Sequence, residues 1–175
     1  MGRSTIVLQR ECFEITELQR YLLQVRRVLK GKPATRVEEL LDSLFAEISC
    51  CSSILSSRLK SLCADDHTVD LQQTPAPEYF WRIPDGNAGC IEMLDSLHSA
   101  YAHCARTTAE SMSAIAQLDD PESFAVLSWV WAATRQALYF LGACLAGMLP
   151  EWKPTSPPVG FSTGIQGSTI LLRMA

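Results

Sequence analysis

One pair of residues in this chain has the types and the spacing of metal ligands. Asp95 and His98 lie three residues apart, which places a carboxylate and an imidazole on one face if the segment is helical. Helical di-iron proteins combine two carboxylate-histidine pairs of this kind with two further glutamates, and the sequence does not supply the other three parts. We therefore expect Asp95 and His98 to form a surface or capping pair, with a metal enzyme built on them as the alternative.

The remaining nucleophiles and bases form no catalytic pattern. Cys104 follows His103 directly, but neighbouring residues point to different faces of a helix, so this histidine is not placed to activate the thiol. The sequence contains neither a glycine-rich phosphate loop nor a G-x-S-x-G elbow. His67 and His103 are therefore expected to be solvated.

The cysteines indicate a reducing compartment. There are seven of them, an odd number, with no C-x-x-C pair, and most occupy apolar helical positions, as buried reduced thiols do. The first residues do not predict a secretory signal, because Arg10 and Glu11 interrupt the apolar run. We therefore expect a cytoplasmic protein.

Length and charge limit the possible partners. The chain has 175 residues, of which 47% are hydrophobic and 19% charged, which is enough apolar material for the core of one domain. Its formal net charge of -4 repels phosphate backbones. DNA is therefore not expected to be a partner.

Four amphipathic segments predict an all-α fold. They span residues 4–30, 35–63, 88–118 and 120–148, with apolar positions at three- and four-residue spacing. A capping box of Thr35 and Glu38 opens the second helix, and Asp120 followed by Pro121 opens the fourth. Residues 1–150 are therefore predicted to form one four-helix bundle, and residues 151–175, which are rich in Pro, Gly and Ser, an irregular tail.

The predicted connection between the second and third helices is long. Residues 64–87 are polar and contain proline, whereas loops in helical bundles usually have about 2–8 residues. A crossover of this length lets the second and third helices run in the same direction, as in ferritin-like bundles. We therefore expect a ferritin-like four-helix bundle with a long crossover between helices 2 and 3.

The fourth predicted helix is apolar nearly all round. Arg135 stands near the middle of residues 124–149, where it would cost roughly 2.5–3.5 kcal/mol at a bilayer centre, so no membrane span is expected. A neighbouring subunit covering the outer face explains the same composition. Four aromatic residues suit both a core and an interface, and one or two are expected to face the bundle interior: Trp129, Trp131, Tyr139 and Phe140.

Several local motifs resemble the Dps branch of the ferritin-like family. The segment 28–31, Val-Leu-Lys-Gly, followed by a long amphipathic helix, is similar to the family's H-W-x-x-x-G. Without gaps from Gly31, the family's E-R-L motif falls on residues 57–59, Ser-Arg-Leu. Residues 118–121 stand in place of the family's G-D turn, and residues 138–145 resemble its W-x-F-x-A-x-L ending. These segments cover most of residues 20–146.

The resemblance implies a di-iron site shared between subunits, whose ligands are largely replaced here. The family's two histidines, aspartate and D-x-x-x-E correspond to Arg26, Glu38, Asp42, Ser53 and Ser57. Asp42 is preserved, and Glu38 is either an oxygen ligand or only the capping residue. Arg26 brings a permanent positive charge and the serines remove two carboxylates, so a standard ferroxidase centre is not expected. Arg26 is instead able to form a salt bridge to Asp42 or Glu38.

The resemblance also implies a function, which we state as an expectation. Dps proteins form hollow homododecamers that store iron and protect against peroxide, so this chain is expected to be a Dps-like oligomer with itself as partner. Iron is the cofactor that the resemblance implies, whereas Arg26, Ser53 and Ser57 stand at three of the ligand positions that ferroxidase activity needs. The alternative is a non-enzymatic helical scaffold or interaction protein of ferritin-like fold.

Overall fold

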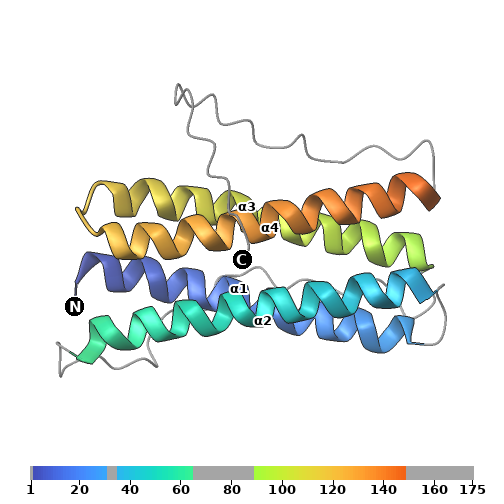
Figure 1. The fold of residues 1–175 in the computed structure, drawn as a ribbon, viewed down its shortest axis with the longest axis horizontal. Coiled ribbons are helices and arrows are strands. Elements are labelled where there is room, and N and C mark those ends of the chain that lie inside the picture. Colours follow the sequence, from blue (N-terminus) through green and yellow to red (C-terminus); the bar gives the residue numbers. More distant parts are fainter. Residues whose placement is uncertain (1, 31–34, 65–88, 149–175) are drawn as a thin grey trace, which may run out of the picture.

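Four helices make up nearly all of the described part of the chain (Figure 1). A computed structural model describes residues 2–30, 35–64 and 89–148. The helices are α1 (Arg3–Leu29), α2 (Thr35–Ala64), α3 (Cys90–Ala116) and α4 (Pro121–Met148). Each boundary agrees with its predicted position to within two residues, and no strand occurs in these three ranges. The all-α class and the four-helix bundle are thereby confirmed.

The helices form two hairpins that pack against each other. α1 packs on α2 and on α3, and α4 packs on α3 and on α2. Near the end of α2, Arg58 contacts Asp120 at the start of α4, so α2 and α3 end at the same end of the bundle and run in the same direction (Figure 1). The predicted crossover, His67 and the predicted tail lie outside the described residues.

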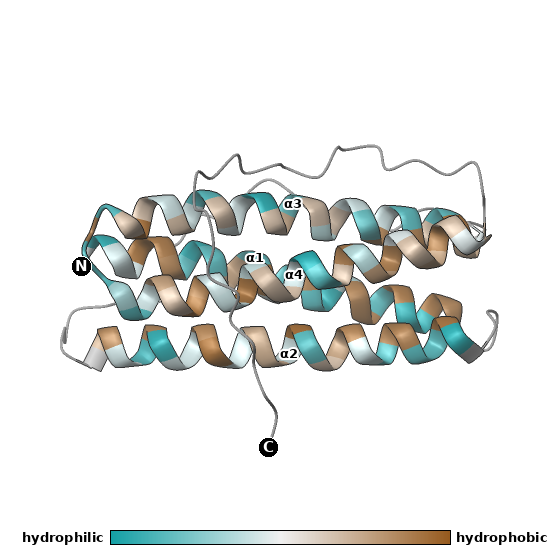
Figure 2. Ribbon diagram, turned by 45° about the horizontal axis from the view of Figure 1, so that its top comes forward, coloured by the Kyte–Doolittle hydropathy of each residue, from teal (hydrophilic) through white to brown (hydrophobic). Residues whose placement is uncertain are grey.

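The core follows the apolar stripes that the sequence predicts. In α2, six apolar residues at intervals of three and four residues are buried, and Leu62, two turns further on, is half-buried. The six are Val37, Leu41, Leu44, Ile48, Cys51 and Leu55. In α1, Ile15, Leu18, Leu22, Val25 and Leu29 are buried in the same way, whereas Val7 and Phe13 are half-buried. Polar residues between these positions, coloured teal in Figure 2, recur along α1, α2 and α3.

The start of α4 is fixed by the residues that the sequence singled out. Asp120 Oδ1 accepts the Ser123 backbone N–H at 3.0 Å, and its Oδ2 accepts the Ser123 hydroxyl at 2.7 Å, which confirms the predicted cap. The preceding residue, Asp119, has a φ of 52°, in the left-handed region that favours glycine. The capping box predicted at Thr35 lies outside the described side chains.

Candidate functional site

Three of the predicted ligand positions lie together at one end of the bundle. Arg26 near the end of α1 and Glu38 and Asp42 in the first turns of α2 line a cleft of about 320 Å³. Glu38 and Asp42 are one helical turn apart and both exposed. The cleft also contains Arg27 and Lys30, so cationic side chains surround the two carboxylates.

Arg26 forms an ion pair with Asp42, one of the two carboxylates predicted as its partners. Its Nη2 donates to Asp42 Oδ1, and its guanidinium carbon lies 5.0 Å from the centre of the Phe45 ring, a distance typical of a cation–π contact. A metal ion at Asp42 would have to displace this cation or sit beside it. The ion pair is partly solvated, since 61% of the Asp42 side chain is exposed, so it adds little stability.

The two serines at predicted ligand positions lie elsewhere on α2. Ser53 and Ser57 are exposed and follow Asp42 by 11 and 15 residues, which corresponds to about 16 and 22 Å along the helix. Within one chain, the structure therefore does not bring them to the Arg26–Asp42 cleft. A site shared between two chains, as the resemblance implies, stays a prediction.

The pair Asp95 and His98 differs from the expected surface pair. His98 is buried, with 7% of its surface exposed, whereas Asp95 is half-buried. Burial lowers the pKa of His98, although the Asp95 carboxylate acts in the opposite direction. The surface prediction is wrong for His98 because it lies between Leu94 and Tyr101 on the core-facing side of α3.

A buried polar cluster between α1 and α3 was not predicted. Glu11 is 0% exposed and Glu14 3% exposed, one turn apart on α1. His103 on α3 places its Nε2 3.7 Å from Glu14 Oε2, while the Arg106 guanidinium lies 3.1 Å from its Nδ1. If Arg106 donates to Nδ1, the ring proton is on Nε2 and faces Glu14. The expectation that His103 is solvated is therefore wrong, since only 15% of its side chain is exposed.

The hydroxyl groups around Glu11 indicate that this carboxyl group holds a proton. Ser111 donates to Glu11 Oε2 at 2.8 Å, and Thr108 Oγ1 lies within hydrogen-bond distance of both Glu11 Oε1 and the Cys104 carbonyl oxygen. The Thr108 hydroxyl has one proton and can donate it to only one of these two acceptors. If it donates to the Cys104 carbonyl oxygen, a proton on Glu11 makes the hydrogen bond between Glu11 and Thr108. Burial raises the pKa of Glu11 to about 7, and the hydrogen bonds from Thr108 and Ser111 limit the rise.

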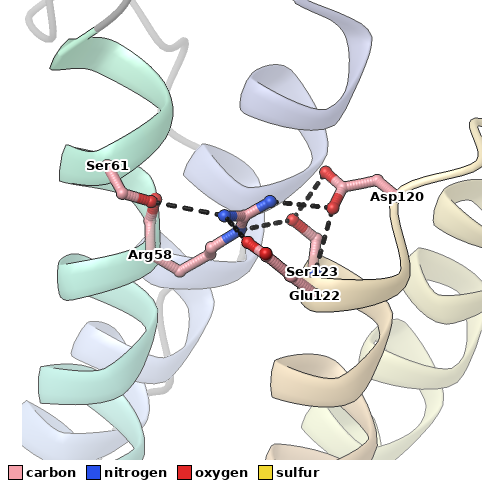
Figure 3. A network of polar contacts seen from close by, with 5 residues as sticks. All are labelled: Arg58, Ser61, Asp120, Glu122 and Ser123. Atoms are coloured by element: carbon pink, nitrogen blue, oxygen red, sulfur yellow. Dashed lines mark hydrogen bonds and ion pairs between the residues drawn. The ribbon is translucent and has the colours of Figure 1, made fainter.

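A second polar network ties α2 to the start of α4 (Figure 3). Arg58, the arginine of the Ser-Arg-Leu motif, donates from Nη2 to Asp120 Oδ1 at 2.8 Å and from Nε to the Ser123 hydroxyl at 3.0 Å. It also contacts Glu122. Burial would raise the pKa of Asp120, but hydrogen bonds from Ser123, Ser4 and Arg58 lower it overall. This network joins the two hairpins at the end of the bundle where α2 ends and α4 begins.

The outer face of α4 carries the largest exposed apolar side chains of the described residues. Trp129, Tyr139 and Phe140 are 41%, 73% and 44% exposed, and Trp131 is half-buried. None of the four is buried, so the expectation that one or two would face the interior is wrong. The interior positions of α4 are taken by smaller residues such as Leu127, Val130 and Ala137, because α3 and α2 lie close on that side.

No family model, no curated protein and no solved structure matches this chain. The function is therefore inferred from the contacts and exposure of the residues in this chain. The described ranges contain no group of three or more His, Cys, Asp or Glu side chains placed to hold a metal ion. All seven cysteines are free thiols, of which Cys51 and Cys104 are buried and Cys50 is exposed, so the prediction of buried thiols is confirmed for two of them.

One helix in the described part of the chain is long and apolar enough to cross a membrane. It is α2, over Arg36–Cys63, and the finding rests on length and composition alone. The core helix of a soluble protein passes the same test. The segment that the sequence raised as a candidate span, in α4, does not pass it.

Proposed function

We propose that this chain is a non-enzymatic, ferritin-like helical scaffold that works through protein contacts made by the outer face of α4. The observation that supports this most is the outward orientation of Trp129, Tyr139 and Phe140 on α4. Aromatic residues are enriched in protein interfaces, and Trp and Tyr carry much of the binding energy there. Exposed apolar side chains gathered on one helix of a small protein mark a site of contact.

The ferritin-like part of the proposal is supported by the direction of the helices. α2 and α3 run in the same direction, and the residues between them, 65–88, are numerous enough for a long crossover. The resemblance to Dps proteins adds self-assembly to the proposal, and the free cysteines add a cytoplasmic location. A dodecamer is the form that the Dps family takes.

The non-enzymatic part is supported by the charges at the predicted ligand positions. Arg26 contacts Asp42 in the cleft, and Arg27 and Lys30 line the same cleft. Three cationic side chains around two carboxylates oppose the binding of a divalent cation. The proposal therefore gives this cleft no role in metal binding.

Iron binding at Glu38 and Asp42 is the second candidate function. It is favoured by one observation: two exposed carboxylates lie one helical turn apart beside a cleft of about 320 Å³. Carboxylate oxygens at this spacing are suited to a hard divalent cation. This candidate and the scaffold differ in whether Asp42 takes part in chemistry.

Oxidation of Fe(II) tests the two candidates against each other. The purified protein is given Fe(II) under air and, separately, with hydrogen peroxide, and Fe(III) formation is followed by absorbance. For the scaffold we expect the same rate as for Asp42→Asn and for buffer alone, and no retained iron after desalting. A saturable rate that falls at least about tenfold in Asp42→Asn, and not in the matched control Asp119→Asn on the exposed turn, would overturn the scaffold proposal.

A further inference from the structure

Seven of the solvent-facing residues of α4 form a stripe that is symmetric about Gln136. Seven exposed positions follow one another at intervals of four, three and four residues on each side of this glutamine. They are Ala125, Trp129, Ala132, Gln136, Phe140, Ala143 and Gly147. Intervals of this kind keep the stripe on one face over the whole helix. The intervals between stripe positions are therefore the same toward either end of α4.

Residue sizes along the stripe are complementary on reversal. Seven residues before Gln136 stands Trp129, and seven residues after it stands Ala143. Four residues before stands Ala132, and four residues after stands Phe140. If a second α4 is laid antiparallel with its Gln136 opposite the first, each large side chain meets a small one. Large-against-small pairing is what lets helices interdigitate at close approach.

The stripe is also nearly free of charge. Within residues 123–148 the single charged residue is Arg135, whose guanidinium lies 5.5 Å from the centre of its own Trp131 ring. Gln136 carries both a donor and an acceptor, so two copies that meet at a two-fold axis satisfy each other. A desolvated interface is disfavoured by charges at its centre, and here the centre holds an amide.

The exposed apolar area matches what a small symmetric interface buries. Phe124, Trp129, Tyr139, Phe140 and Met148 expose between 37% and 73% of their surfaces. Trp129 and Phe140 belong to the stripe, and Phe124, Tyr139 and Met148 stand next to stripe positions in the sequence. At roughly 200 Å² for a residue of this size, the five expose about 450 Å² in one chain. A dimer that covers all five in both chains buries about 900 Å², which is close to the roughly 1,000 Å² of a specific contact.

We infer that the partner of the α4 face is a second copy of this chain, bound antiparallel about a two-fold axis that passes beside Gln136. The inference rests on the proposed function and specifies its partner. In the dimer Trp129 of one chain packs against Ala143 of the other, Phe140 packs against Ala132, and the two Gln136 amides pair at the axis. The contact is isologous, so it closes at two copies.

Charge pairing at the axis tests this geometry. Gln136→Glu and Gln136→Lys each place like charges opposite one another, so each variant alone is expected to self-associate at least about tenfold more weakly than the wild type. Mixed in equal amounts, the two variants are expected to regain the wild-type affinity, because each heterodimer places opposite charges at the axis. Sedimentation velocity over a concentration series measures the mass as a multiple of the 19.4 kDa chain.

The exposed Gln24 on α1 supplies the matched control, and Gln24→Glu and Gln24→Lys should leave the mass unchanged. A wild-type chain that stays monomeric at about 100 μM, single variants that keep the wild-type mass, or a mixture that fails to reassociate would each overturn the antiparallel dimer. These outcomes leave the iron experiment unaffected. Conversely, iron oxidation that depends on Asp42 would overturn the scaffold and leave the dimer standing.

Discussion

Glu11 is a carboxyl group held entirely inside the α1–α3 contact, and its surroundings suit the protonated form. The Thr108 and Ser111 hydroxyls satisfy it, whereas no arginine or lysine contacts it among the described residues. An ionised Glu11 would share this interior with Glu14, whose charge further raises the pKa of Glu11. The folded protein therefore binds a proton at Glu11 more tightly than the unfolded chain does.

The stability of the bundle is expected to depend on pH through this residue. The pKa of Glu11 rises from 4.5 to about 7 on folding, so its contribution is fully present below pH 4.5 and is lost as pH rises through 7. The loss amounts to about 3 kcal/mol. Glu11→Gln, which keeps the shape and carries no charge, should match the wild type at pH 4 and exceed it at pH 8 in urea unfolding.

The difference between the two proteins isolates Glu11, because His98 and the other titrating groups are present in both. Glu17→Gln, on the partly exposed side of α1, serves as the control and should give a curve parallel to that of the wild type. Parallel curves for Glu11→Gln as well would show that Glu11 is ionised at no cost in the folded state.

Arg58 is expected to stabilise the bundle through its contact with Asp120. Its side chain is 17% exposed and its partner Asp120 13% exposed, so Arg58→Met leaves a largely buried carboxylate without its cation. We expect a loss of about 2–3 kcal/mol in the free energy of unfolding. Arg27→Met, at an exposed position on α1, should change it by less than about 0.5 kcal/mol. Equal effects would contradict a specific role for the network.

The buried polar residues could have been found from the sequence, because they stand at positions of the apolar stripes. A search for apolar residues alone does not detect them. Glu11 lies on the α1 stripe between Leu8 and Ile15, and Thr108 and Ser111 continue the α3 stripe from Cys104. Polar residues at stripe positions on two helices indicate a shared buried cluster. The contact between Arg26 and Asp42 could be predicted because the resemblance places these two opposite charges in one site. The distance between Ser57 and this contact could not be predicted from the sequence.

At the scale of single elements, the turn before α4 stores a small amount of strain. Asp119 has a φ of 52°, which an L-residue adopts at a cost and glycine does not. Asp119→Gly is therefore expected to raise stability by about 0.5–1 kcal/mol, or a few degrees in Tm, and Asp119→Ala to lower it. Thermal unfolding followed by circular dichroism measures both, and an alanine variant as stable as the glycine variant would refute the strain.

Helix boundaries were predictable from caps, whereas the orientation of α4 was not. Asp120 and Pro121 define its start whatever packs on it. In contrast, an apolar helix has little periodicity to show which side faces the core, so Trp129 and Phe140 could not be assigned to a face from the sequence. The contacts of α4 with α2 and α3 decide this, and these contacts arise from tertiary packing.

At the scale of the whole molecule, the parallel direction of α2 and α3 sets a minimum length for the chain between them. α3 has 27 residues and is therefore about 40 Å long, and α2 ends at the opposite end from where α3 begins (Figure 1). Replacing residues 65–88 by about six Gly/Ser residues, which reach about 20 Å, should abolish the native bundle. A linker of about sixteen residues, reaching about 50 Å, should preserve it.

Circular dichroism and the urea midpoint distinguish these outcomes, because the short linker leaves the hairpins unable to pack in the native direction. A protein with the six-residue linker that unfolds at the wild-type midpoint would contradict the parallel arrangement of α2 and α3.

The buried polar contacts between the two hairpins also determine how the hairpins align with each other. Glu11 with Thr108 and Ser111, Tyr21 with Ser96 at 2.6 Å, and Arg58 with Asp120 all join α1 or α2 to α3 or α4. Apolar side chains tolerate many ways of sliding one hairpin over the other, but these groups find donors and acceptors in a single alignment. If one hairpin were displaced by one helical turn, Glu11 and Arg58 would both lose their hydrogen-bond partners. The polar groups therefore determine how the two hairpins align, and the apolar core stabilises the result.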